Sequence, residues 1–459
     1  MRFTRRQVVV GAAAAGVLGA AGIYEAVDQL ASSPQRPPAA APGPEQHLLG
    51  GQRIVHDNGA EVIVPPLHHE LVTATVDTGD LRDAQRRLEA ALAGLDARYP
   101  ATPAGLGVTV AWGLPYFRRY VPGPARRYLP RDRRAAKPAL LDAIRFPSDP
   151  SGTILEQNDV AVLLRSDRLD HIADAEEALF HDTGFLRMTS VRKGFAGGGF
   201  DGGVGLPKQM AVAAGVPGAD LIPETAELFM GFTSTLAANL GPDRIANLET
   251  LGLALIPDGY FRGGTHMHLS HITEDLEAWY LNFAYDERVD TTFHPGLKVK
   301  PGTQTVPQGP SEVATTADVV RDYRRLGTIG HSQSMQPSSR LQDDYLGEDG
   351  TLYKKGTAIP QRADFNTLDS PFFWSADPKR DGMSETPAAG VHFVVFNPTS
   401  DDFHRNRLAM DGVLPDGTKL AFEPHSRGQG FNAVLTTTHR QNFLVPPRRH
   451  RSFPLAERL

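Results

Sequence analysis

The chain has 459 residues, of which 41% are hydrophobic and 22% charged, with 45 glycines and 36 prolines. At roughly 100–200 residues per domain, this length predicts two domains or one large one, and the composition is that of an ordinary globular protein. The net charge is −6, from 47 Lys and Arg against 53 Asp and Glu, so we expect no nucleic-acid partner. No cysteine is present, which excludes disulfide scaffolds, iron–sulfur clusters, thiolate ligands and cysteine nucleophiles.

A targeting segment is predicted at the start of the chain. Arg5 and Arg6 precede an uncharged run from Gln7 to Tyr24 that is rich in Ala, Gly and Val, and this pattern is typical of a twin-arginine export signal. We therefore predict a signal peptide over residues 1–33, the twin-arginine export machinery as a partner, and a location that is secreted, periplasmic or on the cell surface. The alternative is a membrane-spanning helix, because the run approaches spanning length. The twin-arginine route carries folded proteins, which suggests a cofactor that is loaded before export.

Residues 34–60 begin with a Pro- and Ala-rich stretch and are predicted to form an extended linker. The folded part is predicted to consist of two similar halves, an N-terminal module over 61–232 and a C-terminal module over 233–459. The second half contains a long Gly- and Pro-rich excursion from about 294 to 385. Excursions of that length inside a domain are usually functional or mobile.

Hydrophobic periodicity predicts strands and helices in the order of a ferredoxin-like α+β unit in each half. In the first half, strands are predicted at 69–76, 107–112 and 159–164, and helices at 81–95 and about 172–183. In the second half, strands are predicted at 264–272, 390–396 and 442–446, and helices at 275–283 and 401–411.

Several short sequence motifs, in their order and spacing, resemble those of the dye-decolorising (DyP-type) peroxidase family. The resemblance covers nearly all of the chain after the signal peptide. The motifs are Leu67-His-His-Glu-Leu-Val-Thr-Ala74, Gly107-Val-Thr-Val-Ala-Trp-Gly-Leu-Pro-Tyr-Phe117, Leu228-Phe-Met-Gly-Phe232, Gly263-Gly-Thr-His-Met-His-Leu-Ser-His-Ile272, Asp275-Leu-Glu-Ala-Trp279, Ile329-Gly330 and Phe443-Leu-Val-Pro-Pro447. The resemblance implies an α+β fold of two ferredoxin-like modules in a dimeric α+β barrel architecture. It also implies a b-type haem in the C-terminal module, oxidation of bulky small molecules by peroxide, and a homo-oligomer.

The family's catalytic residues do not carry over to this chain. Where the family has an Asp that helps to split peroxide, the chain has Gly231 to Thr235, and the hydroxyl of Ser234 cannot relay a proton as a carboxylate does. In the family, the His that ligates the haem iron precedes a segment that contains an Arg on the distal side of the haem. The corresponding stretch, 359–373, contains no His and has no Arg near Leu368 to Ser370. Ser234 and Asp369 are therefore the candidate catalytic residues.

A group of histidines suggests a metal site instead. On the strand that includes His266 and His268, alternation places these two side chains on one face and His271 on the other. His392 lies on a strand that we expect to be a sheet neighbour, and His266, His268 and His392 together are predicted to bind one transition metal, copper or iron, although imidazole also accepts zinc.

Two further residues are candidates for cofactor binding. His331 follows Ile329-Gly330, where related proteins usually have an Arg near the cofactor, and Arg262 precedes the histidine strand. Three functions remain open at this point. The chain is an exported oxidoreductase that uses the His-cluster metal with oxygen or peroxide as the oxidant, a haem b peroxidase with an atypical axial ligand, or a non-catalytic metal or haem carrier.

Overall fold

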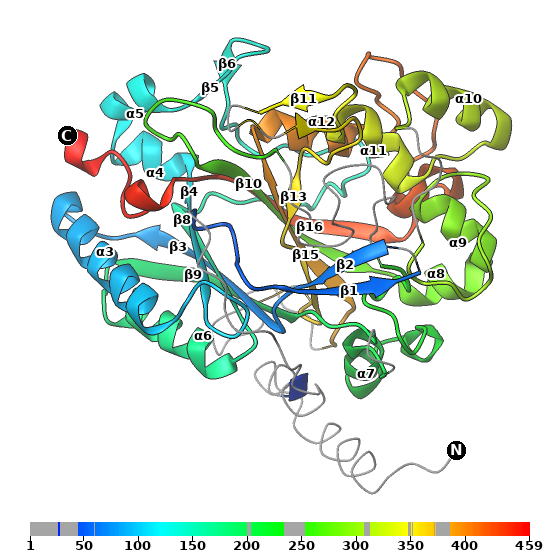
Figure 1. Ribbon diagram of the computed structural model, residues 1–459, viewed down its shortest axis with the longest axis horizontal. Helices are drawn as coiled ribbons and strands as arrows, with labels where there is room; N and C mark the ends of the chain where they lie inside the picture. The colour runs from blue at the N-terminus through cyan, green and yellow to red at the C-terminus, as the bar shows by residue number, and fades with distance from the viewer. Residues whose placement is uncertain are drawn as a thin grey trace, which may run out of the picture.

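The computed structural model describes residues 26–27, 45–58, 60–199, 203–233, 253–306, 313–347, 350, 352–370, 372 and 386–459. Almost all of the predicted signal peptide, residues 34–44 of the predicted linker and Ser234 lie outside these residues. Strands and helices alternate along the chain, and the fold class is α+β, as expected. Figure 1 shows the strands in the middle of the molecule, with α3 and α6 on the left and α8 to α11 on the right.

The first module is a complete ferredoxin-like unit. Its elements in chain order are β3 (His68–Val76), α3 (Leu81–Arg98), β4 (Gly107–Gly113), β8 (Val160–Ser166), α6 (Leu169–Glu176) and β9 (Leu186–Phe195). The four strands are antiparallel in the order β9-β3-β8-β4, which is the strand order of a βαββαβ unit. The connection from β4 to β8 carries α4 (Leu114–Arg119), α5 (Pro122–Tyr128), β5 (Arg131–Asp132), β6 (Lys137–Pro138) and β7 (Ile154–Leu155).

Helix α3 illustrates how the sequence fixes this module. The side chain of Asp80 accepts hydrogen bonds from two backbone N–H groups of the first turn, and Arg98 lies in the last turn, where a cation interacts favourably with the helix dipole. Leu88, Leu92 and Leu95 recur at three- and four-residue spacing and are buried, so this stripe packs the helix against the outer face of the sheet.

The second module repeats the same order with longer connections. Its elements are β10 (Thr265–Glu274), β14 (Phe365–Thr367), β15 (Gly390–Asn397), α12 (Ser400–Met410) and β16 (Leu435–Val445). The strands are antiparallel in the order β16-β10-β15-β14. Between β10 and β14 the chain forms α8 (Leu276–Asn282), α9 (Tyr285–Thr292), α10 (Thr316–Leu326), α11 (His331–Ser339), β11 (Tyr345–Leu346), β12 (Leu352–Tyr353) and β13 (Gln361–Arg362). Strands β1 (Arg53–Asp57) and β2 (Ala60–Val64) form a separate hairpin, and α7 (Leu206–Ala213) connects the modules.

The two sheets join at both edges and close a barrel. Strand β16 pairs with β4, where Leu444 is opposite Trp112. Strand β14 pairs with β9, where Asn366 is opposite Phe195. Each module therefore contributes four strands to the ring, and an eight-stranded barrel is just wide enough for side chains to fill its interior. That interior is a continuous apolar cluster that includes Leu71, Leu163, Met267, Leu269, Phe365, Val394, Phe396 and Phe443.

The expectation of two ferredoxin-like modules is confirmed by these strand orders. Two of the eight barrel strands were not predicted, β9 in the first module and β14 in the second, and the short strands outside the barrel were not predicted either. Strand β14 and helices α10 and α11 lie inside the 294–385 excursion, where Gly and Pro obscure the periodicity. Within the part of the chain that the structure describes, no helix has the length and apolar character needed to cross a membrane.

The barrel interior supplies a first prediction. Phe365 is fully buried in the interior cluster and contacts His69 and His392, with ring centroids 5.0 and 5.2 Å away. Phe365→Ala leaves a cavity beside the β14–β9 junction and is expected to lower the free energy of unfolding by about 3–5 kcal/mol, measured by urea denaturation. The matched control is Leu346→Ala on the exposed β11–β12 hairpin, which should change it little. A loss at Phe365 as small as that of the control would contradict the closed barrel.

Candidate functional site

A cavity of about 240 Å³ lies on the outer face of the second module's sheet. Strands β10, β15 and β16 form its floor, and α9, α11 and α12 stand over it. Its apolar wall includes Leu228, Met230, Phe232, Ile272, Phe293, Met335, Pro360, Val391, Phe393, Val395, Phe403, Met410, Phe431 and Leu435. Its charged and imidazole groups are Glu274, His331, Arg340, Arg362, Asp364, Arg407 and Arg440. A mostly apolar cavity with a few convergent polar groups is the usual form of a small-molecule site.

His331 is the one predicted site residue that lines this cavity. It is the first residue of α11, and Met335 lies one turn later on the same face. Its Nδ1 is buried without a hydrogen-bond partner among the described residues, and its ring lies 4.6 Å from that of Phe431. Burial, with smaller contributions from Arg362 and Arg407, lowers the pKa of His331 to about 3. The imidazole is therefore neutral at physiological pH, the form that binds a metal ion.

Two arginines give the α11 side of the cavity an excess of positive charge. Burial and the neighbouring Arg362 lower the pKa of Arg340 to about 9. Among the described residues, no carboxylate lies within ion-pair distance of Arg340, and its nearest acceptor is the carbonyl of Gly356 at 3.4 Å. Arg362 approaches Asp364 at 3.8 Å. The described part of the chain thus supplies no counter-charge to the Arg340 guanidinium, and an anionic group on a ligand would supply one.

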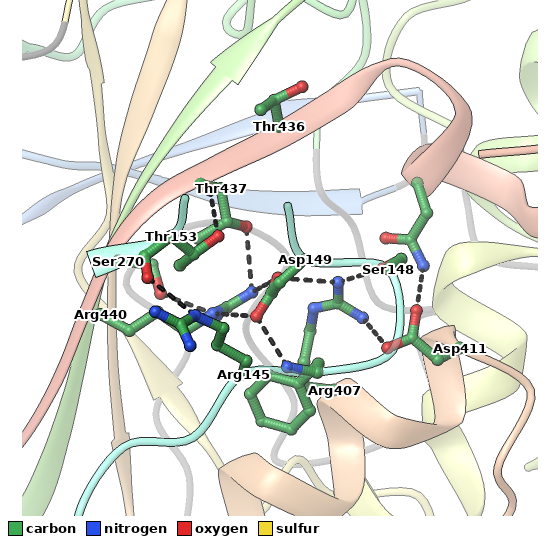
Figure 2. A network of polar contacts seen from close by, with 12 residues as sticks. Arg145, Ser148, Asp149, Thr153, Ser270, Arg407, Asp411, Thr436, Thr437 and Arg440 are labelled. Atoms are coloured by element: carbon green, nitrogen blue, oxygen red, sulfur yellow. Dashed lines mark hydrogen bonds and ion pairs between the residues drawn. The ribbon is translucent and has the colours of Figure 1, made fainter. Parts of the chain in front are cut away.

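A buried ion network forms the end of the cavity at α12 (Figure 2). Asp149 accepts two hydrogen bonds from Arg440, at 2.8 and 2.6 Å, and lies 3.5 Å from Arg407. Arg407 also donates to Ser148 at 2.6 Å and pairs with Asp411 at 2.8 Å. Because Asp149 comes from the connection between β6 and β7, the network ties the first module to the floor of the second module's cavity.

The predicted metal group is not assembled. His268 lies on the outer face of the sheet, but both of its ring nitrogens are occupied: Nδ1 donates to Asn442 Oδ1 and Nε2 accepts from Ser270 Oγ, each at 2.6 Å. His266 is on the same face and is buried, and neither residue lines the cavity. Within the described residues, no group of three or more His, Asp or Glu side chains is placed to hold a metal ion.

His392 is on the opposite face of the sheet from His266 and His268, so the expectation that the three converge is wrong. The register pairs His392 directly with His271, and residues directly opposite on antiparallel strands share a face. Their rings lie 4.9 Å apart on the interior side of the barrel. The alternation of side chains shows which residues of one strand share a face. Which residues of two neighbouring strands share a face depends on the register between the strands.

The other predicted residues also lie away from the cavity. Asp369 is near the barrel interior, where its carboxylate is 3.8 Å from His392 Nε2 and its backbone carbonyl is 3.1 Å from His271 Nε2. Arg262 is exposed in the loop before β10, and its carbonyl accepts a hydrogen bond from Arg449. Ser234 is outside the described residues, next to Thr233, which lines the cavity.

The comparisons with known proteins place the chain in a family. A family model described as a family of unknown function (DUF7405) matches residues 66–447, so the chain belongs to that family. No curated protein sequence matches the chain.

Solved structures with a similar fold include several DyP-type proteins. A DyP-type peroxidase from Cellulomonas bogoriensis is 17% identical, with a TM-score of 0.49 over 86% of this chain and 95% of that chain. A dye-decolorizing protein from V. cholerae is 15% identical, with a TM-score of 0.46 over 85% and 97% of the two chains. The encapsulated DyP-type peroxidase from Mycobacterium smegmatis is 14% identical, with a TM-score of 0.46 over 84% and 95%.

The buried network generates a stability prediction. Asp149 is fully buried between two arginines, and removal of one partner of a buried ion pair leaves an uncompensated charge. Asp149→Ala is therefore expected to lower the free energy of unfolding by about 3–5 kcal/mol. The control is Asp344→Ala, which breaks an exposed pair with Lys354 and should cost less than about 1 kcal/mol. Equal effects of the two variants in denaturant titrations would show that the network does not stabilise the fold.

The histidine pair inside the barrel generates a pH prediction. Burial, with a smaller contribution from Arg192, lowers the pKa of His271 to about 3, and burial followed by His271 lowers the pKa of His392 well below 6.5. Asp369 at 3.8 Å from His392 would favour a proton on the ring, but full burial next to another imidazole outweighs it. The unfolded chain binds protons on both rings below about pH 6.5, whereas the folded chain does not, so stability is lost as the pH falls.

For each such ring the loss is about 1.4 kcal/mol per pH unit. His392→Leu is expected to make the decline of unfolding free energy below about pH 6.5 shallower by that amount, measured by urea denaturation at a series of pH values. His181→Leu, at an exposed position, should leave the slope as in the wild type. An unchanged slope in His392→Leu would mean that this ring is already protonated in the folded protein.

Proposed function

We propose that the protein is an exported oxidoreductase of the peroxidase type that binds a b-type haem in this cavity, with His331 as the protein's ligand to the iron. The observation that carries the proposal is the neutral imidazole of His331, whose buried Nδ1 has no partner among the described residues, at the wall of an apolar cavity. The order of DyP-like sequence motifs along the chain supports the same function.

The cavity's side chains fit such a cofactor in three respects. A b-type haem has a broad apolar ring, an iron atom that accepts an imidazole, and two carboxylates. Aromatic and aliphatic side chains from β15, α12 and the 228–232 segment line the space for the ring. His331 supplies the imidazole, and Arg340 and Arg362 supply the positive charge that matches carboxylates.

Bound haem supplies the redox chemistry by which peroxide or oxygen oxidises a small-molecule substrate. The chain's own residues hold and surround it. His331 stays neutral because burial and two arginines disfavour its protonated form, so no proton has to leave before it binds iron. Phe393, Phe403 and Phe431 line the cavity with aromatic rings. An apolar lining disfavours water, and a drier site strengthens the electrostatic interactions within it.

This proposal replaces the transition-metal site, for copper or iron, that was expected at His266, His268 and His392. That group does not meet on one face of the sheet, and His268 already uses both ring nitrogens in hydrogen bonds. A haem carrier without turnover is the second candidate. This candidate is favoured by the 228–233 segment, which contributes no carboxylate to the cavity wall. Its side chains in the wall are Leu228, Met230, Phe232 and Thr233.

Export by the twin-arginine route belongs to the same proposal. The paired arginines and the uncharged run before residue 33 support it, and folding before export would let the cofactor be inserted inside the cell. A fusion of residues 1–33 to a reporter, compared with the same fusion carrying Arg5→Lys and Arg6→Lys, tests it. Export of both fusions at equal rates would rule out this route.

The haem proposal predicts a spectroscopic outcome. Full-length protein produced with a haem supply is expected to show a Soret band and about one iron per chain, and His331→Ala is expected to lose most of both. The control is His425→Ala, because this imidazole lies outside the cavity and is hydrogen-bonded to the carbonyl of Asn432 at 2.7 Å. A folded wild type without a Soret band, or a His331→Ala variant that keeps its haem, would contradict the proposal.

A further inference from the structure

Glu274 is a carboxyl group in the cavity wall that the proposed haem site does not use. It is the last residue of β10, and Asp275 turns the chain immediately after it by accepting a hydrogen bond from the N–H of Ala278 at the start of α8. Its side chain therefore stays on the outer face of the sheet, with Ile272, facing the cavity. Its Oε2 is buried and has no hydrogen-bond partner in the described part of the chain.

The groups that face Glu274 disfavour a negative charge on it. Burial raises the pKa of Glu274 to about 8, and Asp364, which lines the same cavity, contributes to the increase. On α8, the phenol of Tyr280 is close enough for the two groups to interact, and Arg288 of α9 lies over the Tyr280 ring at 5.0 Å. Among the described residues, no cation forms an ion pair with Glu274, so a neutral carboxyl is the stable form at neutral pH.

Asp364 differs from Glu274 although both line the same cavity. It lies 3.8 Å from Arg362 Nε, and an adjacent cation favours the ionised form of a carboxyl group. The cavity therefore contains one carboxyl within ion-pair distance of a cation and one, Glu274, that has no such partner among the described residues, and unequal surroundings of this kind can separate the roles of an acid and a base in one site.

Glu274 also lies beside the 228–233 segment, which contributes no carboxylate to the cavity wall. Tyr280 donates a hydrogen bond of 2.6 Å to the carbonyl of Phe229, which ties α8 to the 228–233 segment in the cavity wall. Strand β10 therefore brings a carboxyl group to the part of the cavity where that segment supplies only apolar side chains and Thr233.

We propose that Glu274 gives a proton to an oxygen atom of the molecule bound in this cavity and that Asp364 accepts one from it. The proposal rests on the proposed function, with hydrogen peroxide as the oxidant. Asp364 takes the proton from one peroxide oxygen, and Glu274 gives its proton to the other. The O–O bond breaks, and its electron pair leaves with the protonated oxygen as water. A bound haem would supply the two electrons that the remaining oxygen needs, and the two carboxyls together hold one proton before and after the step.

The first experiment determines the protonation state of Glu274 in protein without a cofactor. Full-length protein labelled with carbon-13 at the Glu side-chain carboxyl is titrated by NMR. Two signals are expected to titrate near pH 8, because burial raises the pKa of both Glu70 and Glu274 to about 8. The signal of Glu274 is the one that is absent in Glu274→Gln and remains in Glu277→Gln, whose carboxyl is exposed on α8. A Glu274 signal that titrates near the ordinary value of 4.5 would overturn the proposal.

The second experiment follows the transfer itself in haem-loaded protein. The rate of the first spectral change on mixing with hydrogen peroxide should fall as the pH rises through about 8, because the acid form of Glu274 is consumed. Glu274→Gln is expected to keep its Soret band, react about 10²–10⁴-fold more slowly and lose that pH dependence. Glu277→Gln should behave as the wild type.

The outcomes separate the two proposals. A wild type that binds no haem overturns the proposed function, whatever Glu274 does. A haem-loaded Glu274→Gln variant with the wild-type rate and pH profile overturns the proton transfer and leaves the haem site intact.

Discussion

The closure of two four-stranded sheets into one barrel is the constraint on which the rest of the structure depends. The β4–β16 and β9–β14 pairs use up the free edges of both sheets, so side chains fill the interior, most of them apolar, with His271 and His392 among them. The space for a ligand lies instead on an outer face of the sheets. On the first module α3 and α6 pack directly on that face, whereas on the second module α9, α11 and α12 enclose a cavity.

The alternation of side chains along β10 then decides which groups can act together. Ser270, Ile272 and Glu274 point outward, and Met267, Leu269 and His271 point into the barrel. The sequence predicted this alternation correctly for each strand. It could not predict that His392 is opposite His271, because the register between β10 and β15 depends on the packing of two faces and on connections of many residues.

The fold class and most of the strands were predictable because they depend on local periodicity and on the order of motifs. The cavity was not. His331 was singled out by its place in the sequence, but the other polar groups of the cavity come from different parts of the chain. Glu274 ends β10, and Arg340, Arg362 and Asp364 lie within the excursion whose helices were missed. The one available signal was the charge of Glu274 at an outward position of a buried strand, since a charged residue there requires a partner or a function.

Electrostatics links the fold to the proposed chemistry. Asp149 from the first module neutralises Arg440 and approaches Arg407, so the α12 end of the cavity carries balanced charge. Among the described residues, the α11 end keeps an excess of guanidinium. Burial, with smaller contributions from Arg362 and Arg407, lowers the pKa of His331 and keeps its imidazole neutral. Burial together with Asp364 keeps Glu274 protonated. The proposed haem and oxidant rest on these features together: an apolar cavity with a neutral imidazole, a cation that suits carboxylates and a proton donor.

The most direct measurement is a crystal structure of haem-loaded protein with anomalous scattering recorded at the iron absorption edge. The account predicts one iron peak in the cavity, bonded to the imidazole of His331, with the haem ring between β15 and α12. An iron peak at His266, His268 or His392, or no iron in crystals of a folded protein grown with haem, would contradict it.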